Sequence, residues 1–533
     1  MKPDPFHQSV PAWIKTPFLF ILLISQSVVN GLQGVDINSI ASQLGEEKDL
    51  LQFASLTNSV GFVAMIAIAG HITKIYQRKN VWLICLALEF IIALLMMAPN
   101  NVYEVIFLSF FCGTVKIICL LDAIRLLMQR LNPSGSRGLF YGIYYTISFV
   151  TAQGVAFAAS WLIVDYEWYY IYYLWLPGII ISLIIVQTAL HGNRDESSAM
   201  LKDIDWLSYI ALIIMGLSLS YICVMGERLD WWYDQAINLS SLIFFFSTLT
   251  FVVSNRYHKN PMIDLSAFVR YKQIGWGAVF MVLLYIVYNS SSVISTFLLL
   301  NFKGDVKYAN ISNLYMIPAF MVSVPLTGIW LHKRHKARGA LVFGFFLYTL
   351  FYLLIKNLVA FDISEEALII PQFLRGAAYG VTMTSLSYYI SSNVELKDNS
   401  SRVFFSVFSR YMLAMPITSA FFSHQLAYYK MKFSTDFVQS VPPTDPKVME
   451  FLNSSKAGFM NKGLDLISAQ NMALVSLQKK IAAGAMLRGV DEIFMMLCMI
   501  SVMMMLACLC LKVFNIHYEV WKNSYPLTKL SSS

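Results

Sequence analysis

The stretch Leu83–Met97, LICLALEFIIALLMM, is apolar throughout except for one charged residue, Glu89. A strand that crosses a membrane in a β-barrel alternates polar and apolar side chains over about ten residues. An uninterrupted apolar run instead predicts an α-helix, because a helix satisfies its own backbone hydrogen bonds and can therefore lie in lipid. The run predicts one membrane-spanning helix, and much of the remaining chain repeats its pattern.

Fourteen stretches reach the roughly 20 mainly apolar residues that a spanning helix needs. They are residues 17–41, 51–74, 79–98, 103–128, 138–163, 168–190, 206–225, 235–254, 274–300, 308–331, 338–357, 366–392, 403–428 and 489–513. Charged residues make up only 13% of the 533 residues and hydrophobic residues 57%, so the chain could not cover itself in water. The sequence predicts an all-α polytopic membrane protein with 14 transmembrane helices.

The formal net charge of +8 does not indicate a nucleic-acid partner, because the position of the basic residues has another explanation. They gather in alternate loops between the predicted spans, for example in Lys74–Lys79 and Lys333–Arg338. This asymmetry follows the positive-inside rule, so we expect both chain termini in the cytoplasm. All 7 cysteines fall within predicted spans, so no disulfide framework is expected in the outer loops.

Polar regions divide the chain into parts. The loop 191–205 follows the sixth predicted span and separates an N-terminal six-span half, residues 1–190, from the rest. We expect residues 191–255 to form a cytoplasmic linker with two additional spans, and residues 256–533 to form a C-terminal six-span half. A weak repeat between the fourth and twelfth spans agrees with two related halves, the plan of many secondary transporters.

The outer segment 429–488 lies between the last two predicted spans and contains a helical pattern. One stripe of that helix would carry Leu464, Ile467, Leu474, Leu477 and Ile481. Such a stripe is typical of an amphipathic helix. Two arrangements are open: the segment lies on its own bundle or on the outer leaflet, or it is a docking surface for a partner.

Five local motifs follow one another along the chain. Val35–Ala41 (VDINSIA) lies in the first span, Gly70–Lys79 (GHITKIYQRK) between the second and third, and Trp168–Pro177 at the start of the sixth. Asn260–Leu265 (NPMIDL) precedes the ninth span, and the long segment 429–488 precedes the last. In this order and spacing the chain resembles the 14-span drug:proton antiporter branch of the major facilitator superfamily, that of the EmrB-like multidrug exporters.

The resemblance implies a fold and a function. It implies two six-helix halves plus two extra spans, and proton-coupled export of small amphiphilic or drug-like molecules across the inner membrane of a bacterium. It implies a motif loop that includes Gly70, Arg78 and Lys79. The family's acidic residue in this loop is Lys74 here and a family glycine is Gln77, so the chain is expected to be a divergent member.

Ionisable residues within spans point to the transport site, because a charge at a helix centre costs about 2.5 to 3.5 kcal/mol on insertion scales. Asp36 matches the family's acidic residue in the first span and is the candidate proton-coupling group. The spans that the resemblance places around the central cavity carry Lys116, Arg375, Asn289 and Ser291 as candidate substrate contacts. The structural alternatives are a solvated Asp36 and an ion pair or snorkelling for the cations.

Other charged residues within spans have structural explanations. Glu89 is expected to pair with a neighbouring helix rather than to carry protons. Asp122 and Arg125 are three residues apart and are expected to pair along their helix. Arg410 lies close enough to the cytoplasmic end of its span to snorkel, and is assigned no function.

Enzyme motifs, cofactor motifs and metal-ligand patterns are absent from the sequence, so we expect a transporter without cofactor or metal. The expected partners are protons, a small-molecule substrate, the lipid bilayer and, through residues 429–488, a periplasmic adaptor protein. Two alternatives are a lipid or solute transporter of the same fold with other coupling, and a polytopic membrane enzyme that acts on lipid-linked substrates.

Overall fold

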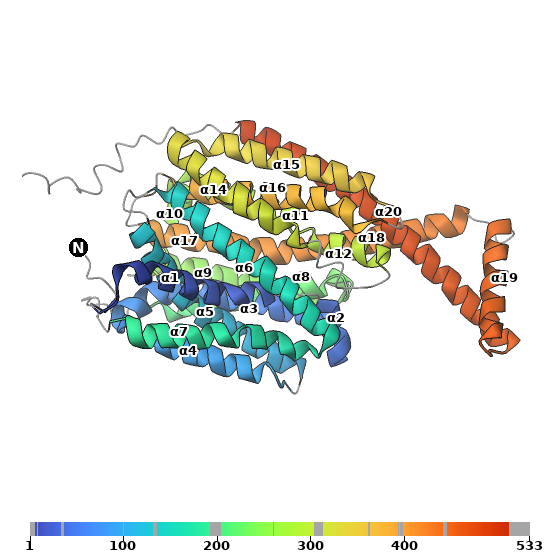
Figure 1. The fold of residues 1–533 in the computed structure, drawn as a ribbon, viewed down its shortest axis with the longest axis horizontal. Helices are drawn as coiled ribbons and strands as arrows, with labels where there is room; N and C mark the ends of the chain where they lie inside the picture. The colour runs from blue at the N-terminus through green and yellow to red at the C-terminus, as the bar shows by residue number, and fades with distance from the viewer. Residues whose placement is uncertain are drawn as a thin grey trace, which may run out of the picture.

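The fold is seen in a computed structural model, in which the chain forms an elongated bundle of roughly antiparallel helices (Figure 1). The structure describes residues 6–7, 9–32, 37–99, 101–131, 136–191, 204–258, 261–302, 313–360, 363–392, 394, 398–440 and 445–510. Within these ranges every regular element is helical, apart from one isolated bridge between Phe6 and Leu190.

The helices follow the predicted spans closely. The first part of the chain forms α1 (Ala12–Leu32), α2 (Ile37–Leu44), α3 (Lys48–Ile75), α4 (Arg78–Leu95), α5 (Val102–Leu131), α6 (Arg137–Asp165), η1 (Trp168–Leu174), α7 (Leu176–Ala189), α8 (Trp206–Met225), η3 (Trp231–Tyr233) and α9 (Gln235–Tyr257). The second part forms α10 (Ser266–Arg270), α11 (Lys272–Tyr288), α12 (Ser291–Asn301), α14 (Met316–Arg334), α15 (Ala337–Asn357), η4 (Glu365–Leu368), α16 (Ile369–Ser391), α17 (Asn399–Val407), η6 (Phe408–Ala414), α18 (Met415–Ser440), α19 (Pro446–Asn461) and α20 (Leu466–Cys510).

The helices are long and apolar enough to cross a membrane repeatedly. Eleven helical stretches among the described residues pass a test of length and hydropathy. The three remaining predicted spans lie on α4, α14 and α16, which are shorter or more polar but are also helical. The predicted all-α polytopic fold is confirmed, whereas the exact number of fourteen spans stays a prediction.

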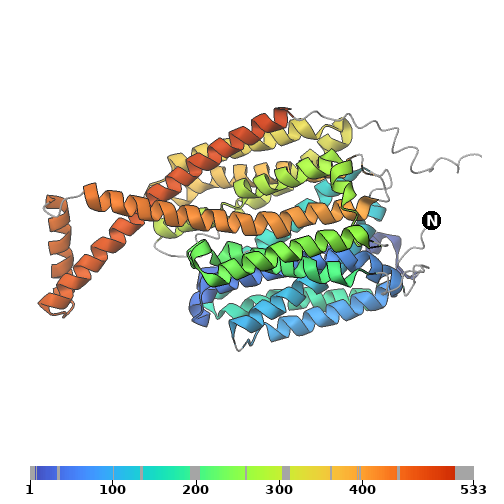
Figure 2. The same ribbon diagram turned by 180° about the vertical axis from the view of Figure 1, so that it is seen from behind.

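The bundle has two main hydrophobic clusters. One joins α1, α3, α4, α5 and α7, and the other joins α11, α12, α14, α15, α16 and α20. Helix α6 packs on α1 of the first cluster and on α14 of the second. Helix α8 packs on α3 and on α18, and α9 packs on α8, so this pair covers the junction from the other side (Figure 2).

The two ends of the bundle differ. We call the end where α1 and α4 begin the amino-terminal end, and the opposite end, where α3 begins and α8 ends, the projecting end. At the projecting end α18 and α20 continue beyond the bundle and α19 joins their tips, forming a triangular projection (Figures 1 and 2). Helix α20 has 45 residues, about twice what a membrane span needs.

The projection differs from the expectation that segment 429–488 lies on its own bundle. The apolar stripe is split: the side chains of Leu464, Ile467 and Leu474 are exposed, whereas Ala469 and Ala473 are buried on the same helix. Helix α20 packs against α19, and the side-chain ammonium of Lys480 lies 4.6 Å from the ring centroid of Phe451. The segment is helical as the pattern predicts, but the small Ala469 and Ala473 are more deeply buried than any residue of the stripe, of which Leu477 and Ile481 are half-buried.

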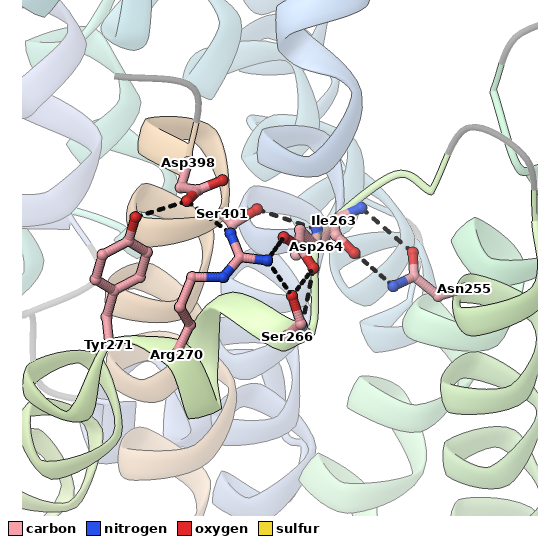
Figure 3. A network of polar contacts seen from close by, with 8 residues as sticks. All are labelled: Asn255, Ile263, Asp264, Ser266, Arg270, Tyr271, Asp398 and Ser401. Carbon is pink, nitrogen blue, oxygen red and sulfur yellow. Dashed lines mark hydrogen bonds and ion pairs between the residues drawn. The ribbon is translucent and has the colours of Figure 1, made fainter. Parts of the chain in front are cut away.

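A polar network stabilises the amino-terminal end (Figure 3). Arg270 at the end of α10 forms ion pairs with Asp398, at 3.0 Å, and with Asp264, at 3.3 Å. The hydroxyl of Tyr271 also donates to Asp398, and the backbone N–H of Asp264 donates to the hydroxyl of Ser401. The network therefore ties the segment before α11 to the start of α17.

Asp264 is held in its charged form within this network. The hydroxyl and backbone N–H of Ser266 donate to its carboxylate and, with the nearby Arg270, hold the pKa of Asp264 below its ordinary value of 3.8. A carboxyl with a lowered pKa stabilises the fold above that ordinary value, and the contribution is lost only as the pH falls through the lowered pKa. Above about pH 5 Asp264 therefore stays charged and available to Arg270.

The change Asp398→Asn tests this network. It removes the charge that Arg270 and Tyr271 share, so we expect a melting temperature a few degrees below that of the native protein at pH 7, measured on purified protein. The control is Asp491→Asn. Among the described residues this acid pairs with Arg488, three residues away on the same helix, where a loss should be small. Equal melting temperatures for the two variants would contradict the proposed contribution of the network.

Candidate functional site: a central cavity

A cavity of about 800 Å³ lies in the middle of the bundle and extends to the projecting end. Helices α1, α3 and α6 line one side of it, and α11, α12, α16, η6 and α18 line the other. Its exposed charged lining residues, Lys48, Arg228 and Lys430, lie at the projecting end, whereas Arg375 is buried in its deeper part. The cavity has the size of a typical small-molecule site.

A break between α11 and α12 shapes one wall of the cavity. The polar run Tyr288–Ser292, which was expected within a single span, interrupts the helix at Asn289 and Ser290. A break leaves backbone carbonyl groups without helical partners, and in lipid these must be satisfied by other groups. The hydroxyl of Tyr352 donates to the carbonyl of Val287, and Arg375 donates to that of Tyr288.

Arg375 of α16 lies against this break. Its Nη2 donates to the Tyr288 carbonyl oxygen at 3.1 Å and to the Ser291 hydroxyl at 2.6 Å, and the guanidinium lies 5.6 Å from the Tyr288 ring centroid. Its Nη1 has a long contact of 3.5 Å with Gln372, and its Nε is buried without a hydrogen-bond partner. The side chain is thus fixed by neutral groups and retains unused donor capacity.

Arg410 is a second guanidinium in the cavity. It lies in η6, a π-helical segment that separates α17 from α18, and both Arg410 and Tyr411 line the cavity. Its Nε donates to the Tyr285 hydroxyl and its Nη2 contacts the Tyr379 hydroxyl at 3.4 Å. The expectation that Arg410 snorkels is wrong, because its side chain points inward. A π-helical turn shifts the register of a helix and often occurs at functional sites.

Aromatic rings surround both guanidinium groups. The rings of Tyr288 and Tyr379 stack with centroids 3.5 Å apart, and Phe149 packs on Tyr379 with centroids 4.8 Å apart. Arg410 lies 4.8 Å from the ring centroid of Tyr411. Tyr144 and Phe320 also line this part of the cavity. The deep part therefore combines fixed positive charge with flat apolar surfaces.

The amino-terminal end of the bundle is closed below the cavity. Helices α6 and α14 cross where Gly138 and Gly142 meet Gly328: a Cβ at residue 328 would lie 2.9 Å from the Gly138 carbonyl oxygen and 3.0 Å from the Gly142 Cα. The hydroxyl of Tyr145 hydrogen-bonds that of Ser387 at 2.6 Å. The closure thus depends on backbone contact that only glycine permits.

A layer of polar contacts lies beside this crossing. The hydroxyls of Tyr141 and Ser391 are 2.6 Å apart, and Arg402 donates to both. These contacts join α6 to α16 and α17, which come from distant parts of the chain. The cavity is therefore accessible from the projecting end and closed at the amino-terminal end.

The candidate substrate contacts divide into two groups. Arg375, Asn289 and Ser291 line the cavity together. Lys116 of α5 is buried behind the lining: its ammonium donates to the side-chain oxygen of Asn30 at 2.9 Å, and it is Asn30 that faces the cavity. Their roles in transport stay predictions, and Arg410 is the cavity residue that the sequence reasoning missed.

Glu89 lies in the same buried layer as Lys116. The carboxylate accepts a hydrogen bond of 3.1 Å from Gln26 of α1, and the side chain is fully buried. One carboxylate oxygen has no hydrogen-bond partner among the described residues. Glu89 thus contacts a neighbouring helix, as expected, and does not line the cavity.

The motif loop makes its contacts within the first part of the chain. Arg78 pairs with Asp122 of α5 at 3.0 Å, and the Trp82 indole N–H donates to the same carboxylate. The expected pair between Asp122 and Arg125 is therefore wrong: the buried carboxylate faces α4, where two donors converge on it. Lys79 donates to the carbonyl of Gln187 at the end of α7.

Two candidate positions are not described in full. Asp36 lies outside the described residues, between the end of α1 and the start of α2. Its neighbour Ile37 is described and lines the cavity. Gly70 lies on α3, near the amino-terminal end of the bundle. The assignments of Asp36 and Gly70 stay predictions.

Comparison with known proteins identifies the family. A sequence profile of the Major Facilitator Superfamily matches residues 19–419. The chain belongs to this superfamily. It is 21% identical over 474 residues to the probable multidrug resistance protein EmrY of Escherichia coli K12, covering 87% of this chain and 90% of that protein. It is 26% identical over 219 residues to the multidrug export protein EmrB of Escherichia coli K12, covering 40% and 41%.

Solved structures of superfamily members share the fold. A POT family transporter in complex with 5-aminolevulinic acid gives a TM-score of 0.58 at 10% identity, covering 95% of this chain and 97% of that one. The nucleoside transporter NupG gives 0.55 at 12% identity, covering 93% and 98%. The predicted resemblance to EmrB-like proteins is confirmed, and the low identities mark a divergent member. The protein is a multi-pass membrane transporter of small molecules and not an enzyme.

The change Gly328→Val tests the closure of the amino-terminal end. The added side chain would meet backbone atoms of α6, which cannot move aside, so conformations with this end open should gain population. Spin labels at Gln77→Cys and Lys333→Cys, in a Cys510→Ser background, report the distance between the start of α4 and the end of α14 by double electron–electron resonance. We expect a larger long-distance population than in the parent.

Gly339→Val serves as the matched control, because a Cβ at residue 339 has nothing within 4 Å. A distance distribution for Gly328→Val that coincides with that of Gly339→Val would show that the crossing of α6 and α14 does not set the closure.

Proposed function

We propose that the protein is a proton-coupled secondary transporter that exports small amphiphilic or drug-like molecules by alternating access, in the inner membrane of a bacterium. The central cavity is the observation that supports this most, since it is accessible from one end of the bundle and closed at the other. The names of the relatives, multidrug resistance and multidrug export proteins, support the substrate class. In this proposal the amino-terminal end faces the cytoplasm.

The division of the chain follows from the same proposal. Residues 1–190 and 256–533 act as two moving halves, and residues 191–255 add the linker and two further spans. The cavity is lined from both parts, by α1, α3 and α6 and by α11, α12, α16 and α18, which supports a site between the halves. Rocking of the halves around a central site is how many secondary transporters alternate access.

Each candidate residue has a role in this mechanism. Arg375, Asn289 and Ser291 contact the substrate, and Lys116 acts through Asn30, which it holds at the cavity surface. Asp36 carries the proton, because a carboxylate that is buried in one state and hydrated in the other binds and releases a proton. The motif loop with Gly70, Arg78 and Lys79 anchors the first half at the amino-terminal end.

Transport into everted membrane vesicles with an imposed pH gradient tests the coupling. Two probes of opposite charge, dansylglycine and ethidium, keep this test independent of substrate charge. We expect at least one of them to accumulate when the vesicle interior is acidic, and Asp36→Asn to reduce that accumulation at least tenfold. Accumulation that survives Asp36→Asn unchanged would remove the role of Asp36, and accumulation that ignores the pH gradient would remove proton coupling.

We also propose that a periplasmic adaptor protein docks on the projection, at α19 and α20. Exposed apolar residues cluster there, including Leu464, Leu466, Ile467, Leu474 and Val475. Contiguous exposed apolar surface is typical of an interaction site. The projection extends away from the bundle (Figure 1).

The double variant Ile467→Asp/Leu474→Asp separates docking from transport. We expect it to abolish export of the transported probe from whole cells while leaving accumulation in everted vesicles unchanged, because vesicles do not need the adaptor. The control is Gln470→Asp/Gln478→Asp, which adds the same charge at exposed polar positions of the same helix. Export from cells that is unaffected by the first double variant would contradict the adaptor.

A further inference from the structure

The two deep guanidinium groups of the cavity, those of Arg375 and Arg410, have no acidic partner among the described residues. No carboxylate lies within ion-pair distance of Arg375 or Arg410 among the residues that the structure describes. The described acidic residues that line the cavity are Asp49 and Glu227, and both lie at the projecting end. Glu227 contacts His424 there, at 2.9 Å. Positive charge therefore dominates the deep part of the cavity.

Other arginines of the protein form ion pairs with acidic side chains. Arg78 pairs with Asp122, Arg228 with Glu47 and Arg270 with Asp398. These three lie near the ends of the bundle, where water lowers the cost of an unpaired charge. Arg375 and Arg410 lie deep in the bundle, where that cost is highest, and yet neither has an acidic partner among the described residues.

Neutral groups orient the two guanidiniums without neutralising them. Arg375 donates to a backbone carbonyl and a serine hydroxyl, and Arg410 to tyrosine hydroxyls. The Nε of Arg375 remains without a partner although it is buried. A guanidinium binds a carboxylate through two parallel hydrogen bonds, which none of these neutral groups supplies. The geometry leaves a place for an anionic group that comes from outside the protein.

We propose that the deep part of the cavity binds organic anions, in which a carboxylate lies between Arg375 and Arg410 and an aromatic or apolar body packs on the tyrosines. This inference rests on the proposed function and narrows its substrate class. Tyr288, Tyr379 and Phe149 provide flat apolar surfaces beside the charges, and a cavity of about 800 Å³ accommodates more than the anionic group alone.

The mouth of the cavity differs from its deep part in charge. Lys48, Arg228 and Lys430 line it together with Asp49 and Glu227, and Arg228 is paired with Glu47, so the charges at the mouth nearly balance. A cleft with an excess of one charge raises the local concentration of the opposite ion. Among the described lining residues, that excess lies in the deep part, at Arg375 and Arg410.

Binding of a matched pair of probes tests the proposal. Dansylglycine and dansylglycinamide share one fluorescent aromatic body and differ in a carboxylate and a neutral amide. We expect purified full-length protein, in nanodiscs of phosphatidylcholine so that no anionic lipid competes, to bind dansylglycine saturably and at least ten times more tightly than the amide. Energy transfer from tryptophan to dansyl gives the readout.

Variants assign the preference to the two arginines. Arg410→Gln should weaken dansylglycine binding at least tenfold and leave the affinity for the amide unchanged. Because Arg375 also satisfies the helix break, Arg375→Lys is the suitable change there, and it should weaken dansylglycine binding by a smaller factor. Arg228→Gln is the matched control, since that arginine lines the same cavity but is paired with Glu47, and it should change neither affinity.

Three results would overturn the proposal: equal affinities for the two probes, no saturable binding of dansylglycine, or an unchanged preference in Arg410→Gln. Each of these would leave the proposed function standing, because transport in vesicles is tested with a cationic probe as well. Conversely, a preference for the carboxylate without any pH-driven accumulation would support the anion site and contradict proton-coupled export.

Discussion

The burial of two positive charges in the middle of a membrane bundle is the constraint on which the rest of the site depends. Each buried charge costs about 2.5 to 3.5 kcal/mol on insertion scales, so the surrounding structure must compensate for Arg375 and Arg410. The break between α11 and α12 supplies carbonyl and hydroxyl acceptors for Arg375, and the tyrosines supply acceptors and ring faces for Arg410. Cation–π contacts of this kind are worth about 0.5 to 2 kcal/mol each, more where water is excluded.

These compensations also explain the irregular backbone of the site. Helix α11 ends at Tyr288 and η6 replaces a regular α-helical turn around Arg410, and both irregularities face the cavity. Irregular backbone at membrane depth is tolerated where it lines a cavity or is buried in protein. The amino-terminal end instead has regular, tightly packed helices, since α6 and α14 touch through glycine backbone at Gly142 and Gly328. In the proposed mechanism of alternating access, one end of the pathway is open and the other is tightly packed, and the structure has one end of each kind.

The spans and part of the site could be predicted from the sequence, because hydropathy reports directly on the membrane. Arg375, Asn289 and Ser291 were singled out as polar groups at lipid depth, and they line one cavity. Arg410 was missed because its distance from the helix end suggested snorkelling, and a sequence does not reveal that a π-helical turn rotates a side chain inward. Asp122 was assigned to Arg125 by helical spacing, whereas the tertiary contact with Arg78 prevails. Periodicity predicts the helix in the projection but does not say which of its residues are buried: Ala469 and Ala473 are, whereas Leu464, Ile467 and Leu474 are exposed.

A cryo-electron microscopy structure of the protein in nanodiscs with dansylglycine bound tests most directly whether Arg375 and Arg410 bind an anion. We predict density for the carboxylate between the guanidinium groups of Arg375 and Arg410, with the dansyl ring against Tyr288 or Tyr379 and the amino-terminal end closed. A map in which either arginine pairs with an acidic side chain or faces lipid, or in which the ligand binds elsewhere, would contradict the proposal that these two arginines bind the anionic group of a substrate.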